Sequence, residues 1–252
     1  MTRSKVEFTN TQGQKLAGLL ELPDQGKPRA IALFAHCFTC GKDIAAASRI
    51  ARALAKHDIG VLRFDFTGLG NSDGDFANTS FSSNLDDLVA AGEFLEEHYQ
   101  APRILVGHSL GGAAVLAVAH RMESVEAIAT ISAPATAQHV RHLFDDKAGE
   151  IQDAGVAEVT LAGREFQVKR QMLADLEQWN TPDHIGNLHK ALVIFHSPVD
   201  QIVDISEAAT IFQAAKHPKS FISLDNADHL LSKPIDADYV AEMLVAWSSR
   251  YL

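Results

Sequence analysis

The stretch Gly107-His108-Ser109-Leu110-Gly111-Gly112 decides the fold of this chain. It follows the apolar run 104–106 and precedes the small-residue segment 113–119, so a strand, a tight turn and a helix are expected in succession. Glycines two residues before and two residues after Ser109 leave room for the strand and the helix to approach closely. A serine at such a turn points its hydroxyl outward, which makes Ser109 a candidate nucleophile.

The composition indicates a soluble globular chain. Of the 252 residues, 46% are hydrophobic, which is enough for one large α/β core. The formal net charge of −10 is spread along the sequence with no lysine- or arginine-rich block, which argues against nucleic acid or an anionic membrane as a partner. The N-terminus lacks the apolar core of a secretion signal, and no apolar run reaches the roughly 20 residues that span a bilayer. We therefore expect a cytoplasmic protein with a small-molecule substrate.

The apolar runs predict a mostly parallel, doubly wound sheet. Strands buried on both faces are almost continuously apolar, and five runs have this character: residues 30–35, 60–64, 103–107, 127–132 and 191–196. Helical patterns lie between them, and this alternation is typical of an α/β fold. Two alternating segments, 5–9 and 15–22, predict an N-terminal antiparallel hairpin. A helix at 206–215, a strand at 220–224 and a helix at 236–251 complete a single domain over residues 1–252.

Residues 134–190 are several times too long for one crossover helix, so they predict an inserted lid. Within them, segments 156–161 and 165–168 alternate around a turn at 162–164 and predict a hairpin, and a helix up to residue 179 follows. An insertion at the carboxyl ends of parallel strands lies over the place where such sheets bind ligands. Its apolar side chains at Met172, Leu176 and Trp179 are candidate substrate-binding residues.

Ser109 needs a base within hydrogen-bond reach, and the base needs an acceptor that orients it. Asp200 follows the strand that ends at residue 196, and His229 follows the strand that ends at residue 224. His229 would take the Ser109 proton and Asp200 would orient the imidazole, without a metal or cofactor. Asp204 and Asp228 are alternative acids, although we expect Asp204 to cap the next helix and Asp228 adjoins His229 too closely to reach its ring.

A fourth element is the loop 36–41, which follows the buried strand 30–35. The backbone amides of Phe38 and Leu110 would form an oxyanion hole, and each such donor is typically worth roughly 10²–10³ in rate. The Phe38 side chain would then line the acyl pocket.

Four motifs carry a resemblance to a known superfamily: residues 36–43, 63–72, 107–112 and 226–229. Together they resemble the α/β-hydrolase superfamily of serine esterases over essentially the whole chain. The chain is most similar to the hydrolase half of bacterial two-domain proteins that also carry a thiol-peroxidase domain of the osmotically inducible (OsmC) type. That resemblance implies a thiol-peroxidase domain as a partner. The predicted lid is similar to the lid of cinnamoyl and feruloyl esterases, which implies carboxylic ester substrates. With Ser109 as the nucleophile, we expect such esters to be cleaved through an acyl-enzyme intermediate.

Alternatives to an esterase remain open. Thioesterases and peptidases use the same machinery, and a different class would be an acyl-binding or redox-coupled module that works with the thiol-peroxidase partner. The complete set of nucleophile, base and acid argues against a module. Cys37 and Cys40 stand where the family commonly has glycine. We interpret them as small thiols that fit in place of glycine, with a redox switch as the alternative.

Overall fold

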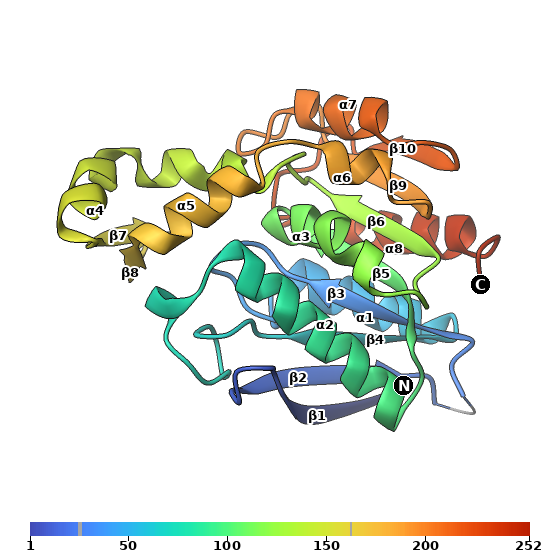
Figure 1. Cartoon of the computed structure of the whole chain (residues 1–252). Helices are drawn as coiled ribbons and strands as arrows, with labels where there is room; N and C mark the ends of the chain where they lie inside the picture. Colours follow the sequence, from blue (N-terminus) through green and yellow to red (C-terminus); the bar gives the residue numbers. More distant parts are fainter. Residues whose placement is uncertain (25–26, 162) are drawn as a thin grey trace.

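A central sheet of eight strands organises the molecule, in the order β1-β2-β4-β3-β5-β6-β9-β10 (Figure 1). The computed structural model describes residues 1–24, 27–161 and 163–252. β1 pairs antiparallel with β2, β2 pairs antiparallel with β4, and the remaining neighbours are parallel. The strands are β1 Thr2–Thr9, β2 Lys15–Leu22, β3 Ala30–Ala35, β4 Ile59–Phe64, β5 Pro102–His108, β6 Ala127–Ile131, β9 Ala191–His196 and β10 Lys219–Ser223.

Helices cover both faces of this sheet and divide the hydrophobic core in two. One face packs against α1 (Ala45–Lys56) and α8 (Pro234–Ser248), and the other against α2 (Phe81–His98), α3 (Leu110–Val118) and α7 (Ile205–Ala214). Short 3-10 helices at Phe76–Asn78 and Ala119–Arg121 join these elements. The doubly wound sheet and the N-terminal hairpin predicted from the sequence are therefore confirmed.

Polar side chains cap the starts of two helices, α2 and α7. Ser80 begins α2 with a reciprocal capping box in which it bonds Ser83, and this satisfies amides that have no partner inside the helix. Asp204 begins α7 by accepting a hydrogen bond from the backbone amide of Ser206. The prediction that Asp204 is a helix cap is confirmed.

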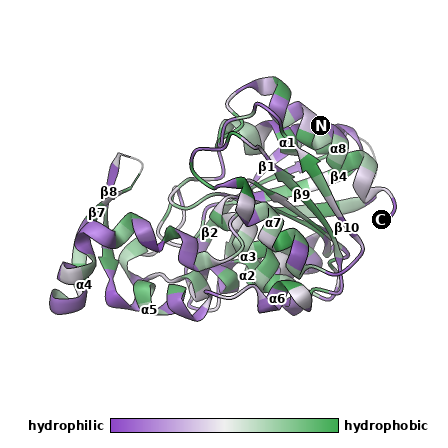
Figure 2. Cartoon of the chain, turned by 90° about the horizontal axis from the view of Figure 1, so that it is seen from above, coloured by the Kyte–Doolittle hydropathy of each residue, from purple (hydrophilic) through white to green (hydrophobic). Residues whose placement is uncertain are grey.

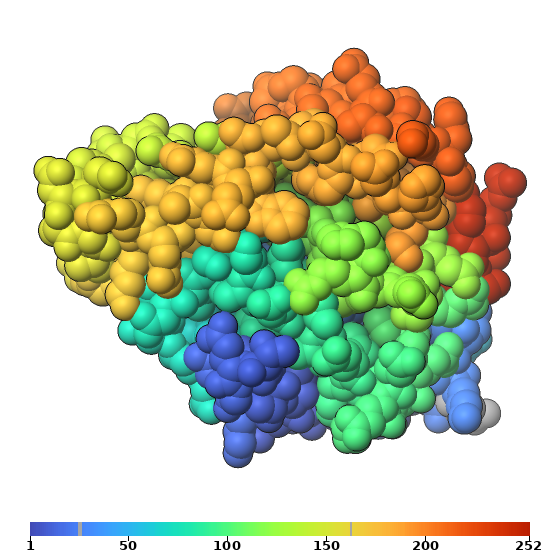
Figure 3. Space-filling model, in the orientation of Figure 1, coloured from blue at the N-terminus to red at the C-terminus, as the bar shows by residue number. Residues whose placement is uncertain are grey.

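The segment between β6 and β9 is an insertion with secondary structure of its own. Its elements are a 3-10 helix Ala137–Lys147, α4 Ala148–Ala154, β7 Val156–Leu161, β8 Arg164–Lys169, α5 Arg170–Gln178 and α6 Asp183–Gly186. The predicted hairpin and helix are both present, although residue 162 of the predicted turn lies outside the described residues. The insertion extends to one side of the sheet and lies against α2 in the space-filling view (Figure 3).

The β7–β8 hairpin projects beyond the body of the molecule when it is seen from above (Figure 2). The ribbon of the insertion alternates between hydrophilic and hydrophobic residues, whereas the central strands are mostly hydrophobic (Figure 2). None of the helices in the described part of the chain combines the length and the apolar character that crossing a membrane requires.

Candidate active site

The turn at Ser109 has the geometry that its sequence predicts. Ser109 lies between β5 and α3 with φ 55° and ψ −126°, a backbone conformation that non-glycine residues rarely adopt. A Cβ atom added at Gly107 would lie 2.3 Å from the carbonyl oxygen of Gly111, and one added at Gly111 would lie 2.4 Å from that of Ala35. Only glycine fits these positions, so the close packing of β5, α3 and β3 holds the strained serine in place.

Ser109, His229 and Asp200 form one hydrogen-bonded chain. The Ser109 hydroxyl lies 3.0 Å from His229 Nε2, and His229 Nδ1 lies 2.9 Å from Asp200 Oδ2. Asp200 accepts only, so His229 carries its proton on Nδ1 and presents a free lone pair on Nε2 to the serine. These three residues follow β5, β9 and β10, so the parallel strands bring them to one edge of the sheet.

The local backbone keeps the Asp200 carboxylate ionised. Asp200 Oδ1 accepts hydrogen bonds from the amides of Ile202 and Val203 at 2.9 and 3.0 Å. Burial alone raises the pKa of Asp200, but the hydrogen bonds from His229 and from these two amides outweigh it and hold the pKa well below its ordinary value. Asp228 instead accepts from the amide of Ser232. Of the three candidate acids, the structure places Asp200 against the histidine.

Cys37 and Cys40 form a disulfide, so their interpretation as thiols is wrong. A tight turn brings them together: the Cys40 amide donates to the Cys37 carbonyl at 3.1 Å, and Thr39 has a positive φ of 59°. The resulting Cα–Cα distance of 5.4 Å lies within the range that a disulfide needs. The crosslink encloses Phe38 and Thr39, and Phe38 supplies one of the two predicted oxyanion amides.

Buried charges fasten the rest of this loop, and sequence reasoning missed them. Lys42 Nζ lies 2.6 Å from Asp65 Oδ2, and the same carboxylate accepts from the Lys42 amide at 2.7 Å. Arg63, on β4, pairs with Glu21 on β2 at 2.7 Å and also donates to the Lys42 carbonyl. All four side chains are buried. One signal was available, because Glu21 and Arg63 each interrupt an otherwise apolar strand.

A narrow apolar pocket adjoins the predicted oxyanion amides. It has a volume of about 20 Å³, room for little more than a water molecule or a methyl group. The Phe38 ring is tilted against Phe76 at a centroid distance of 5.7 Å and lies edge-on to Phe144 of the insertion at 6.1 Å. Phe76 in turn contacts Phe166 of β8 at 4.7 Å. The lining residues are His36, Cys37, Phe38, Thr39, Phe66, Leu69, Phe76, Phe81, Asn84, Leu110, Gly111 and Ala114.

The three predicted substrate-binding residues of the insertion are not among these lining residues. Met172 and Leu176 are 2% and 0% exposed and belong to the hydrophobic core. Trp179 packs edge-on against Phe81, a lining residue, at 5.5 Å. It stays a prediction that Met172, Leu176 or Trp179 contacts a substrate. From the insertion, Phe144 and Phe166 join Phe38 and Phe76 in an aromatic cluster beside the pocket.

Several polar contacts attach the insertion to the body. Asp175 of α5 accepts from both the amide and the hydroxyl of Ser82, at 2.7 and 2.6 Å, at the start of α2. At the other side, Glu207 of α7 accepts from the amide of Ala135 at 2.7 Å. These two contacts place the segment against the starts of α2 and α7.

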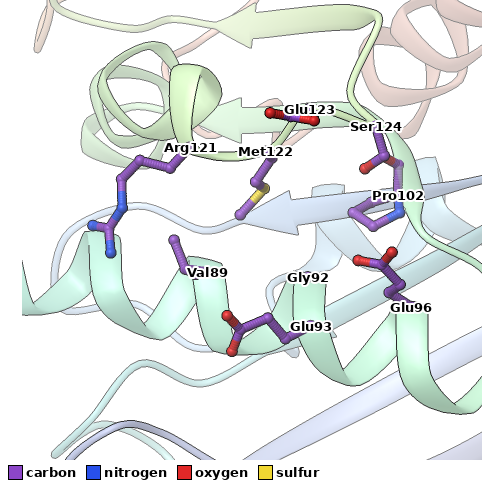
Figure 4. Close-up of a pocket in the computed structure, with 9 residues that line it drawn as sticks. All are labelled: Val89, Gly92, Glu93, Glu96, Pro102, Arg121, Met122, Glu123 and Ser124. Atoms are coloured by element: carbon purple, nitrogen blue, oxygen red, sulfur yellow. The ribbon is translucent and has the colours of Figure 1, made fainter.

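A second hollow lies elsewhere in the molecule and contains none of the predicted site residues. It has a volume of about 290 Å³ and lies between α2 and the chain that leads from α3 to β6 (Figure 4). Glu93, Glu96 and Glu123 give it an acidic rim, and Pro102 places it at the start of β5, the opposite end from Ser109. Within the described ranges, no group of three or more His, Cys, Asp or Glu side chains is arranged to hold a metal ion.

The fold is that of the α/β hydrolases. The chain belongs to the Hydrolase_4 family, serine aminopeptidase, S33, whose match covers residues 26–162. It is similar to the crystal structure of the esterase domain of a Rhodothermus marinus protein, with 49% identity, a TM-score of 0.81 and coverage of 100% of this chain and 99% of that one.

Two more distant similarities are to a solved structure, which has the same fold, and to a protein sequence. The structure of Est1E from Butyrivibrio proteoclasticus with ferulic acid bound has 17% identity and a TM-score of 0.81, over 98% of this chain and 99% of that one. The uncharacterized protein YfhR of Escherichia coli is 23% identical over 233 residues, which are 89% of this chain and 72% of that protein.

Proposed function

We propose that this protein is a serine hydrolase that cleaves small carboxylic esters through an acyl-enzyme intermediate. The observation that carries the proposal is the hydrogen-bonded chain from Ser109 through His229 to Asp200, on a strained turn at the carboxyl edge of the sheet. The esterase domain of 49% identity supports the same reaction class.

In the proposed mechanism, His229 Nε2 takes the Ser109 proton while the serine oxygen attacks the ester carbonyl. The carbonyl oxygen becomes an oxyanion that the amides of Phe38 and Leu110 stabilise. His229 then donates the proton to the departing alkoxide, which leaves as the alcohol. A water molecule attacks the acyl-serine with the same assistance, releases the carboxylic acid and restores Ser109. Asp200 stabilises the imidazolium that forms in each half of the reaction.

The acyl group is proposed to enter beside Phe38. The narrow pocket there favours a short acyl chain, and the aromatic side chains of Phe38, Phe76 and Phe81 favour an uncharged one. The insertion, as a lid, then contributes to selectivity through Phe144 and Phe166, which pack against Phe38 and Phe76.

Amide hydrolysis is the second candidate, because the matched family is described as serine aminopeptidase. An aminopeptidase holds a protonated amino group, for which a carboxylate is the natural partner. The pocket beside Phe38 has no carboxylate among its lining residues. This lining favours the ester over the amide of an amino acid.

A substrate panel with a matched variant tests the proposal. p-Nitrophenyl esters from acetate to octanoate are compared with aminoacyl p-nitroanilides, using wild type and Ser109→Ala. We expect the highest kcat/KM on the shortest esters, little turnover of the anilides, and at least about a 10⁴-fold loss in the variant. Ester turnover near wild type in folded Ser109→Ala would contradict the proposal.

A further inference from the structure

Three buried histidines stand at the carboxyl ends of three parallel strands, and the mechanism above uses none of them. His36 follows β3, His108 ends β5 and His196 ends β9. Their exposed fractions are 2%, 2% and 0%. Titratable side chains are seldom buried this deeply, so three buried histidines at one edge of a sheet require a physical explanation.

Each of the three rings bonds to a backbone carbonyl in a different catalytic loop. His36 Nδ1 lies 2.8 Å from the Cys37 carbonyl oxygen, in the oxyanion loop. His108 Nε2 lies 2.7 Å from the carbonyl oxygen of His229, the proposed base. His196 Nε2 lies 2.8 Å from the carbonyl oxygen of Val203, in the loop of Asp200. Since a carbonyl only accepts, the histidine donates in every case.

The first of these bonds acts directly on the proposed oxyanion hole. The Cys37 carbonyl and the Phe38 N–H belong to the same planar peptide group and point in opposite directions. Because His36 donates to the Cys37 carbonyl, the orientation of this peptide group is fixed and the Phe38 N–H points away from the His36 ring. The Cys37–Cys40 disulfide and the Lys42–Asp65 pair fix the same loop further along.

The other two bonds act on the proposed base and acid. His108 immediately precedes Ser109, so its bond to the His229 carbonyl ties the base to the nucleophile's own strand. The loop that His196 closes at Val203 is the one whose Val203 amide donates to Asp200 Oδ1 at 3.0 Å. Three imidazoles therefore link the sheet to the loop of the proposed oxyanion amide, to the proposed base and to the loop of the proposed acid.

The second ring nitrogen of each histidine is the atom that would carry the extra proton of a charged imidazole. His36 Nε2, His108 Nδ1 and His196 Nδ1 are buried and have no hydrogen-bond partner within residues 1–24, 27–161 and 163–252. A proton there would be a buried donor without an acceptor, which is costly. Burial lowers the pKa of His36, which Asp65 and Lys42 face, and lowers the pKa of His108 to about 4. The groups that face His108 are His229, Asp200 and His36.

We propose that His36, His108 and His196 are positioning residues that, as neutral imidazoles, hold the oxyanion, base and acid loops in the catalytic arrangement. This inference rests on the proposed function for its kinetic consequences, but its structural content is independent of activity. It also assigns tautomers: His36 carries its proton on Nδ1, and His108 and His196 carry theirs on Nε2.

Paired variants test the kinetic consequence. Leucine removes the donor, whereas an amide restores it near the same place: asparagine for Nδ1 at position 36, and glutamine for Nε2 at positions 108 and 196. We expect His36→Leu, His108→Leu and His196→Leu to lower kcat on p-nitrophenyl acetate at least about tenfold with KM changed less than threefold. His36→Asn, His108→Gln and His196→Gln should regain most of that loss. His57→Leu, at an exposed histidine, is the control and should match wild type.

Nitrogen-15 NMR of the histidine rings at pH 7 tests the tautomers directly in the unmodified protein. We expect three neutral rings, with His36 in the Nδ1–H form and His108 and His196 in the Nε2–H form. A charged ring or the opposite tautomer at any of the three positions overturns the assignment for that residue. The NMR result stands even if a leucine variant fails to fold.

The outcomes separate this inference from the proposed function. If wild type turns over the ester and Ser109→Ala does not, the proposed function holds. The inference then fails if the folded leucine variants keep kcat within twofold of wild type, or if the amide variants are no better than the leucine variants. If wild type shows no ester turnover, the proposed function fails, and the NMR tautomers still decide the structural assignment.

Discussion

The carboxyl edge of the sheet and the insertion at residues 134–190 are held in different ways. At the sheet edge, each catalytic loop is fixed by buried bonds from the core, such as the Lys42–Asp65 pair and the bond from His108 to the His229 carbonyl. The insertion has a core of its own and meets the body through an aromatic cluster and a few polar contacts, of which Asp175 with Ser82 is the most complete. In the proposed function, the first region carries out the bond cleavage and the second contributes to substrate selectivity.

The largest expected effect is at the acid of the proposed triad. Asp200→Asn should lower kcat by roughly 10³–10⁴-fold, because an amide can donate to His229 Nδ1 and favour the wrong tautomer. Steady-state kinetics on p-nitrophenyl acetate measures the loss. Asp204→Asn is the matched control, because Asp204 caps α7 by accepting from the Ser206 amide, and it should leave kcat unchanged. Equal kcat values for the two variants would show that Asp200 is not the acid of the triad.

The next effect is the pH dependence of stability at His108. Because burial lowers its pKa to about 4, the unfolded chain binds the extra proton between pH 6.5 and pH 4 and the folded chain does not. The contribution to stability is therefore complete above pH 6.5 and is lost as the pH falls to 4. His108→Gln should reduce the loss of unfolding free energy between pH 7 and pH 4 by about 3 kcal/mol. Urea unfolding at both pH values measures it, and equal losses in the two proteins would contradict the prediction.

A smaller effect is expected at the disulfide of the oxyanion loop. In Cys37→Ser/Cys40→Ser the loop around Phe38 loses its crosslink, and we expect kcat to fall about tenfold, a fraction of the value of one oxyanion donor. Treatment with a phosphine reductant should lower wild-type kcat to the same level and leave the double variant unchanged. If neither the substitutions nor the reductant alters kcat, the crosslink has no part in positioning Phe38.

The smallest effect is expected where the insertion meets α2. Asp175→Ala removes two hydrogen bonds with Ser82 and should raise KM about threefold, with kcat within twofold of wild type. Asp153→Ala, at an exposed residue of α4, is the control. If Asp175→Ala lowered kcat as much as Asp200→Asn does, the insertion would take part in the chemistry, and the sheet edge and the insertion would not have separate roles.

The sequence predicts the arrangement of Ser109, His229 and Asp200 better than the packing of the insertion, for a physical reason. Ser109, Asp200 and His229 each follow a buried strand, and parallel strands bring their carboxyl ends together whatever the surface looks like. The apolar face of α5 was equally visible, but periodicity does not say which neighbour a helix packs against. Met172 and Leu176 turned out to be core, and Phe144 and Phe166 reach the aromatic cluster instead.

Pairings between distant residues were the part that the sequence could not supply. The turn that joins Cys37 and Cys40 includes a positive φ at Thr39, and a threonine in the sequence does not predict that backbone conformation. The three buried histidines were hidden for a different reason. A histidine at the end of an apolar strand is consistent with an exposed position in the next loop, and only the fold shows the carbonyl that each one meets.

The most direct test of the central claim is covalent labelling of the folded protein with a fluorophosphonate, followed by peptide mass spectrometry. The phosphonate requires an activated serine and an oxyanion hole, and it does not depend on the choice of substrate. We predict one label per chain, on Ser109, with labelling at least about a hundredfold slower in His229→Ala. A folded wild-type protein that takes up no label, or takes it up on another serine, would contradict it.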